Sequence, residues 1–345
     1  MKNAIMKFPL LTLASCGALA LTAVSSFAQT AVTGALGYYT FDVPTGNSLW
    51  VCGLVTKADF SGAMLGITLD APNSTIAQTG AAWVSGGFAN HYVEIKEGPM
   101  EGLILDIVGN DENSLTVEGD LLAAPPSGYG LNGDEKYSIH KHATLGTLFP
   151  GGGGLAAFTD SVRLFFSDGS DKTYLYSGSN WVDGLFQNSD DVAVYPGQGM
   201  VFTVGGVRSV TFGGNEISTV KSSPTLVPVY SGQINLLGAI NPLVTTDAGD
   251  PLFGKSVPLG ADDAATTGVI ENGVGVKDVF TPFTDSVRLF ARDGLLTDQG
   301  TFLYSGSNMI DGLFQNSDSV GILTGSAFVV SVGGDKLVKI PSFVP

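Results

Sequence analysis

The stretch FTDSVRLF stands at Phe158–Phe165 and again at Phe283–Phe290. Each copy is followed by a turn of variable length, then by LYSGSN and DGLFQNSD. This internal duplication indicates that the same supersecondary unit occurs twice in the chain. The copies differ in length only between the two blocks, at Ser170–Lys172 and Leu295–Gly300, where a surface turn tolerates insertion.

The repeated block reads as β structure. Val162 and Leu164 alternate with Ser161 and Arg163, which predicts a strand with one face toward a core. Across the chain, 47 glycines and 16 prolines interrupt short apolar runs, and no stretch holds a helical period. With 44% hydrophobic residues the chain can fill a core. We therefore predict an all-β protein with two tandem, related modules of β-sandwich or barrel-like type.

The first copy has a longer interval before its FTDSVRLF block than the second copy has. This extra stretch carries hairpin spacing, as in the alternating segment Tyr92–Lys96, which suits a small β-barrel inserted into a surface loop. We expect the barrel at 58–142, the first module at 29–57 and 143–224, and the second module at 225–345.

The first 28 residues read as a secretory signal. Two lysines precede an apolar run from Phe8 to Val24, and Ala28 ends a small-residue cleavage site. This predicts export to the periplasm, the outer surface or the medium, with a mature start at Gln29 and no transmembrane anchor after cleavage. The alternative is a lipoprotein-type sequence ending at Cys16, which would leave that residue lipidated.

The charge balance excludes one class of partner. The net charge is −16, and loss of Lys2 and Lys7 with the signal makes it more negative by two. Only four arginines occur, so no basic patch can form, and phosphate backbones would be repelled. We expect no nucleic-acid partner. One cysteine, Cys52, follows the signal, so no internal disulfide is expected in the mature chain.

Several longer stretches resemble a known family. They are GYYTFDVP at 37–44, VEIKEGPMEGLILDIVGN at 93–110, HATLGTLF at 142–149 and VYPGQGMVFTV at 194–204. With DSVRLF, these motifs are similar to an uncharacterised family of exported, glycine-rich proteins with many paralogues in verrucomicrobial bacteria. The resemblance implies an exported β protein with no assigned activity and no known catalytic residues.

Two groups of residues have the chemistry of metal ligands. His140 and His142 lie two apart in a predicted strand and so share a face, with His91 as a third ligand; the alternative is a histidine pair on the outer face of a barrel. Four aspartates stand in tight turns that suit Ca²⁺: Asp168, Asp171, Asp190 and Asp191. The alternative is ordinary turn chemistry. We predict no cofactor, with calcium as the one candidate metal.

Aromatic side chains offer the one ligand platform. Tyr174 and Tyr176 share a strand face, with Trp181 just beyond, and such rows can stack on sugar rings. The alternative is packing between sheets. The repeated Arg163 and Arg288 are expected to pair with carboxylates, with Asp183 and Asp311 as the predicted partners.

The function class follows from what the sequence lacks. It has no nucleophile elbow, phosphate-binding loop or zinc-protease helix. We expect a non-catalytic structural or interaction protein of the cell exterior or periplasm. A module that binds a cell-surface glycan is the second alternative, and a glycan-cleaving enzyme with paired carboxylates is the third. A ligand site, if present, is expected on the aromatic and acidic turns of the first module rather than in the duplicated block.

Overall fold

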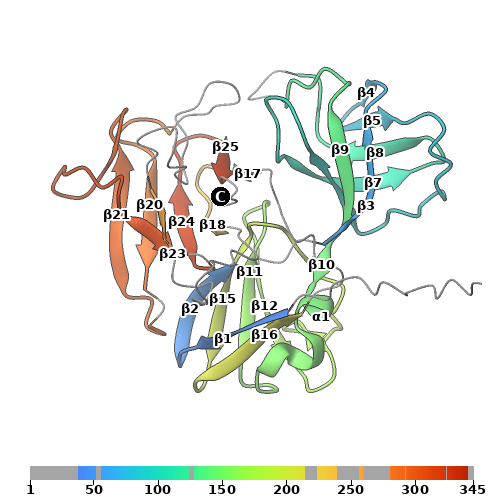
Figure 1. Cartoon of the computed structure of the whole chain (residues 1–345). Helices are drawn as coiled ribbons and strands as arrows, with labels where there is room; N and C mark the ends of the chain where they lie inside the picture. Colours follow the sequence, from blue (N-terminus) through green and yellow to red (C-terminus); the bar gives the residue numbers. More distant parts are fainter. Residues whose placement is uncertain are drawn as a thin grey trace, which may run out of the picture. The chain divides into compact units, whose positions relative to one another are not determined.

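The computed structural model shows a nearly all-β chain (Figure 1). It describes residues 38–51, 56–123, 128–213, 224–238, 256–259, 280–291, 293–323 and 325–340. The predicted signal segment, Gln29 and Cys52 lie outside these ranges, as does Cys16. Within the described residues the helices are one turn of α-helix, α1 (Leu145–Leu148), and one 3₁₀ segment, Pro150–Gly154. None of the helices described is long and apolar enough to cross a membrane.

The region expected as an insert forms one antiparallel sheet with the order β3-β9-β6-β7-β8-β5-β4. Its strands are β3 (Ala58–Ala63), β4 (Ile67–Asp70), β5 (Asn73–Ala77), β6 (His91–Ile95), β7 (Ile104–Asn110), β8 (Ser114–Glu118) and β9 (Lys136–Lys141). The small barrel expected here is not closed by a ladder between the outer strands β3 and β4. Instead, the single segment 58–70 supplies both, bonding to β9 through its first half and to β5 through its second.

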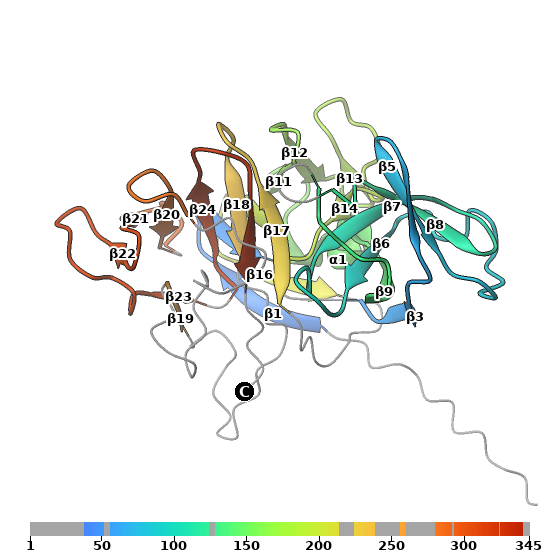
Figure 2. The same ribbon diagram turned by 90° about the horizontal axis from the view of Figure 1, so that it is seen from above.

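The first module is built around a five-stranded sheet with the order β13-β12-β11-β15-β2. Its strands are β2 (Gly46–Val51), β11 (Ser161–Phe165), β12 (Asp171–Tyr176), β13 (Trp181–Val182) and β15 (Gly199–Val204). Two short ribbons accompany it: β1 (Tyr38–Val43) with β16 (Arg208–Gly213), and β10 (Ala143–Thr144) with β14 (Ala193–Val194). β1 and β16 run side by side in both views (Figures 1 and 2). Their inward residues share one core with the sheet, as in a sandwich.

The second module repeats this order as β18-β24-β20-β21-β22. Its strands are β18 (Asn235–Gly238), β20 (Ser286–Phe290), β21 (Asp298–Tyr304), β22 (Met309–Ile310) and β24 (Ala327–Ser331). Two ribbons are again present: β17 (Thr225–Val229) with β25 (Lys336–Ile340), and β19 (Ser256–Pro258) with β23 (Gly321–Leu323). The prediction of two related all-β modules is therefore confirmed.

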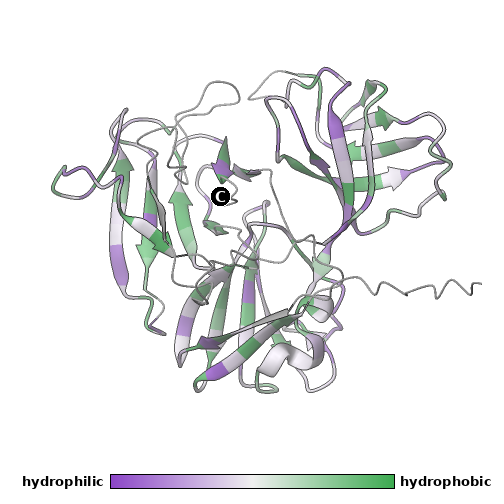
Figure 3. Cartoon of the chain, viewed as in Figure 1, coloured by the Kyte–Doolittle hydropathy of each residue, from purple (hydrophilic) through white to green (hydrophobic). Residues whose placement is uncertain are grey.

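Alternation along the strands explains why these segments form sheets. Val162 and Leu164 of β11 are fully buried, whereas Arg163 between them is exposed. Figure 3 shows hydrophobic and hydrophilic residues following one another along the strands of this module. β20 repeats the pattern with Val287, Arg288 and Leu289, so equivalent strands face their cores in the same register.

The two modules touch through contacts that mirror each other. Val51, at the end of β2, donates its backbone N–H to Gly325 O at 3.1 Å, and Gly238, at the end of β18, donates to Gly197 O at 3.0 Å. Gly197 and Gly325 stand at equivalent turns before β15 and β24. Leu49, Leu236 and Ala327 are buried together at this contact. Such reciprocal pairing is what a two-fold symmetric dimer shows, here within one chain.

A buried aspartate fixes the same loop in each module. Asp160 is fully buried, accepts backbone N–H groups from Ala156 (2.7 Å) and Gly205 (2.9 Å), and pairs with Arg208 at 2.5 Å. Asp285 accepts from Thr281 and Gly333 in the same way. Its cation is Lys336, at 3.1 Å. Both carboxylates are thus satisfied by hydrogen bonds and by charge, as buried carboxylates must be.

We predict that Asp160→Asn lowers the free energy of unfolding by about 2–3 kcal/mol at neutral pH, because a buried charge-assisted network is broken. Burial alone would raise the pKa of Asp160, but the hydrogen bonds from Arg208, Ala156 and Gly205 outweigh it and leave this pKa below its usual value. The stabilisation is therefore present above the unfolded pKa of about 4 and is lost as pH falls through the folded pKa.

Denaturant unfolding of both proteins between pH 7 and about pH 3 measures this effect. The stability gap between wild type and variant should narrow as the pH falls below about 4. A gap that stays constant down to acidic pH would show that the carboxylate charge is not what stabilises the loop.

Candidate functional site

The aromatic residues named from the sequence lie mostly inside the protein. Tyr174 and Trp181 are only 2% and 1% exposed, and Tyr176 is half-buried. Trp181 packs against Phe149 and Tyr176, with ring centroids 5.3 and 6.0 Å apart. Burial, helped by the charge of Asp183, raises the pKa of Tyr174. Tyr174 and Trp181 therefore have no open face for a sugar ring, as the packing alternative expects.

The aspartates named as calcium ligands serve the turns and the repeated arginines. Asp168 accepts from the backbone and hydroxyl of Ser170, Asp171 binds Arg163 at 2.6 Å, and Asp190 accepts from Trp181 N and Asn180. Asp191 is exposed. No group of three His, Cys, Asp or Glu residues suited to a metal ion occurs in the part of the chain that the structure describes. Calcium binding stays a prediction of the sequence.

The arginine pairing differs from the one expected. Arg163 binds Asp171 and Arg288 binds Asp298 (2.7 Å), rather than Asp183 and Asp311. Asp171 and Asp298 lie directly opposite equivalent phenylalanines across the first hairpin of each repeat. The insertion in the second copy moved this aspartate along the sequence, and the structure restores it to the same place.

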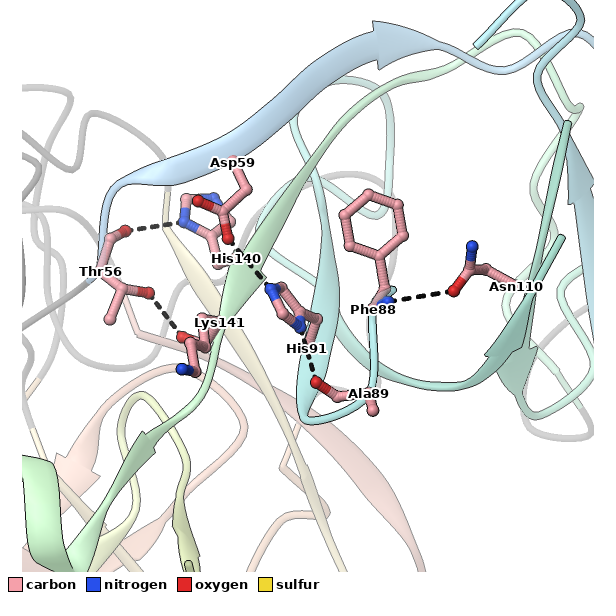
Figure 4. Close-up of polar contacts among 8 residues, drawn as sticks. All are labelled: Thr56, Asp59, Phe88, Ala89, His91, Asn110, His140 and Lys141. Carbon is pink, nitrogen blue, oxygen red and sulfur yellow. Dashed lines mark hydrogen bonds and ion pairs between the residues drawn. The ribbon is translucent and has the colours of Figure 1, made fainter. Parts of the chain in front are cut away.

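The three histidines have separate partners. His91 contacts Ala89 O and Asp59, and His140 bonds to Thr56 O at 2.8 Å (Figure 4). The other ring nitrogen of His140 bonds to Ser138 at 2.8 Å. His142 lies 3.0 Å from a carboxylate oxygen of Asp106. His140 and His142 do share a sheet face, both packing on the ring of Tyr92, but they are buried rather than on an outer surface.

The most pronounced surface feature was not anticipated from the sequence. At equivalent positions of the two modules, one leucine and two phenylalanines are exposed, and we call each such group an apolar tip. The first tip is Phe158, Leu185 and Phe186, and the second tip is Phe283, Leu313 and Phe314. All six side chains are exposed by 58–78%. Single exposed apolar residues are common on proteins, but matching groups of three in both copies of a repeat need an explanation.

An aspartate-capped hairpin loop presents the leucine and one phenylalanine. Two backbone hydrogen bonds close the loop. The N–H of Asp183 donates to the carbonyl of Gln187 at 3.1 Å, and the N–H of Phe186 donates to the carbonyl of Asp183 at 3.0 Å. The Asp183 carboxylate accepts from Leu185 N and Gln187 N, both at 2.9 Å. The loop of Asp311 repeats every one of these bonds within 0.1 Å. Both loops are therefore held in one shape from within.

The backbone of the tips is unusual for bulky residues. Phe158, Phe186, Phe283 and Phe314 all have left-handed backbones, with φ between 55° and 61°. The last position of a three-residue hairpin loop often needs this conformation, and glycine is the residue that adopts it without strain. Non-glycine residues with positive φ are uncommon, and such strain gathers at functional sites.

The second phenylalanine of each tip comes from the loop that the buried aspartate holds. Phe158 N donates to Tyr176 O at 2.8 Å, and Phe283 N donates to Tyr304 O at 2.7 Å. In the first tip the rings of Phe158 and Phe186 are 6.5 Å apart. No lysine or arginine occurs in the tip segments 156–160, 177–190, 281–285 and 305–318. The tip segments themselves therefore carry no positive charge.

The sequence does contain a signal for these tips. Leu-Phe stands between the turn formers Asp-Gly and Gln-Asn in both copies of DGLFQNSD. We interpreted this block as turn and packing residues and expected any site in the first module alone. The structure instead places equivalent exposed groups in both modules.

Comparison with known proteins adds no relative: no protein family model, no curated protein and no solved structure matches this chain.

We predict that Trp181→Ala lowers the free energy of unfolding by about 3–5 kcal/mol, because it empties a large volume in the first core. Trp181→Phe is the control. The buried Trp181 Nε1 has no hydrogen-bond partner, so its removal offsets part of the lost packing and should cost less than about 1.5 kcal/mol. Equal small losses for both variants in denaturant unfolding would contradict the packing role.

The tip phenylalanines are expected to behave in the opposite way. Phe186→Gly with Phe314→Gly should leave the free energy of unfolding unchanged or raise it, by up to about 1 kcal/mol per site. Glycine adopts the left-handed backbone without strain, which stabilises the folded state. We expect this gain in free energy to exceed the cost of the greater conformational entropy that glycine gives the unfolded chain. Thermal and denaturant unfolding test this, and a loss above about 1 kcal/mol would show that these rings stabilise the fold.

Proposed function

We propose that the protein is an exported, non-catalytic interaction protein that binds its partner through the two apolar tips. The observation that carries the proposal is the duplication of the tips in side chain, exposure and strained backbone. Exposed leucine and phenylalanine contribute little to a core, and left-handed phenylalanine costs free energy. A function outside the fold explains why both copies keep them.

Comparison of the two copies strengthens this argument. Some buried positions differ between the modules, since Trp181 corresponds to Met309 and Tyr174 to Phe302, whereas others, such as Val162 and Val287, are identical. The exposed tip residues are identical. Core positions usually tolerate only closely fitting changes, whereas surface positions vary freely. The tips are thus kept as strictly as the most conserved core positions of the repeat, which supports selection on the tips for contact with something else.

Two other observations support the exported and non-catalytic parts of this proposal. The first 28 residues have the charge and apolar run of a secretory signal. The three histidines, which would serve as general bases, each have different partners and do not converge.

Glycan binding is the second candidate, and one observation favours it. Phe158 and Phe186 place two exposed rings 6.5 Å apart, which offers a stacking surface in place of the buried Tyr174 and Trp181.

The proposal is tested in the producing bacterium by replacing the leucine and the adjacent phenylalanine of both tips. We predict that Leu185→Ser, Phe186→Ser, Leu313→Ser and Phe314→Ser together shift the protein from the washed cell envelope to the soluble fraction. Immunoblotting of the fractions measures the shift, and the unfolding temperature of the purified variant should match that of wild type.

The matched control is Val84→Ser with Val207→Ser, which removes exposed apolar side chains outside the tips. Its distribution should equal that of wild type. Unchanged envelope retention of the four-site variant, or a wild type that is never retained, contradicts the proposed function.

A further inference from the structure

This inference rests on the proposed function and names the partner. We infer that the two tips insert their leucine and phenylalanine side chains into a lipid layer whose headgroups carry no net charge. Four features of the tips lead to this class of partner: their composition, their shape, their charge and their number.

The composition of the tips fits lipid better than protein or sugar. Binding energy at protein interfaces concentrates in Trp, Tyr and Arg, and leucine is under-represented there. The tips hold none of those three residue types. Leu185 and Leu313, the most exposed members at 78% and 76%, have no flat face to stack on a sugar ring. Leucine and phenylalanine are, by contrast, among the residues most favourable in the membrane and on the buried face of interfacial segments.

The shape of the tips also fits a soft layer. Each leucine and phenylalanine sits at the apex of a three-residue loop that its aspartate holds from inside. A convex apex needs a complementary hollow in a protein partner but none in a lipid layer. If two copies of the chain packed tip to tip, each would contribute only three side chains to the interface. A specific protein interface contains about 20–30 residues from each partner. A second copy of the chain is therefore too weak an occupant.

The charge around the tips selects the headgroup. The tip segments hold no lysine or arginine. The cations that contact the Phe158 and Phe283 loops, Arg208 and Lys336, are paired with the buried Asp160 and Asp285. Peripheral proteins that prefer anionic lipids use clusters of basic residues. With a net charge of −16, this chain gains nothing from anionic headgroups.

The presence of two tips agrees with the energetics of peripheral membrane binding. One small apolar anchor gives only marginal, reversible attachment, and stable attachment needs a second. Two tips on one chain act together, because binding of the first raises the effective concentration of the other. The duplication would thus turn two weak anchors into one useful attachment.

The test uses the purified protein and phosphatidylcholine vesicles. In flotation assays we expect wild type to bind, each single-tip variant (Leu185→Ser with Phe186→Ser, or Leu313→Ser with Phe314→Ser) to bind about 10–100-fold more weakly, and the four-site variant not to bind. Replacing part of the lipid by phosphatidylglycerol should weaken binding. Val84→Ser with Val207→Ser is the matched control and should bind like wild type.

A spectroscopic readout reports insertion directly. The indole of a Phe186→Trp variant should shift its emission to the blue when phosphatidylcholine vesicles are added, because the ring leaves water. Absence of wild-type binding, equal binding by the four-site variant, or stronger binding to phosphatidylglycerol vesicles overturns the lipid assignment.

The outcomes separate this inference from the proposed function. Envelope retention that depends on the tips, together with no vesicle binding, rejects lipid as the partner and leaves an interaction with an envelope protein or glycan. If the four-site variant behaves like wild type in both envelope retention and vesicle flotation, the proposed function is rejected as well.

Discussion

The buried carboxylates of Asp160 and Asp285 are the constraint on which both modules depend. Each is fully enclosed, and each binds backbone N–H groups from two separate segments together with one cation. The bonds join the loop before the first repeat strand to the turn after β15 or β24. That loop carries Phe158 or Phe283, so the same interaction that closes the sandwich also presents one of the three side chains of each tip. A buried carboxylate without these partners would destabilise the fold, so the loop is constrained to the position in which the partners can reach it.

The sequence predicted the architecture well because its signals are local and repeated. Alternation in SVRLF gave the strands, and Asp-Gly gave the hairpin turns in both modules. How the inserted sheet is completed could not be predicted, because strand periodicity gives no information on which outer strands meet. Here β3 and β4 are consecutive parts of one segment, and each bonds to a different neighbour.

The candidate site was harder to predict because burial depends on tertiary packing. Tyr174 and Trp181 have the composition of a sugar platform, yet both fill the core. Leu185 and Phe186 are residue types that usually lie in a core, yet an aspartate-capped loop exposes them to solvent. The carboxylate that pairs with Arg288 was missed for a related reason: Asp298 comes into position only through a bulge in the longer hairpin. A single sequence shows residue types and spacing, but not which side of a loop faces water.

The most direct measurement of the central claim is covalent footprinting of the tips on intact cells and in the purified protein. Carbene labelling followed by mass spectrometry reports the solvent exposure of each side chain. If the tips are binding surfaces, Phe158, Leu185 and Phe186 and their counterparts in the second module will label strongly in the free protein and weakly on the cell, while Val84 and Val207 label equally in both. Equal labelling of the tips in both states would contradict the account.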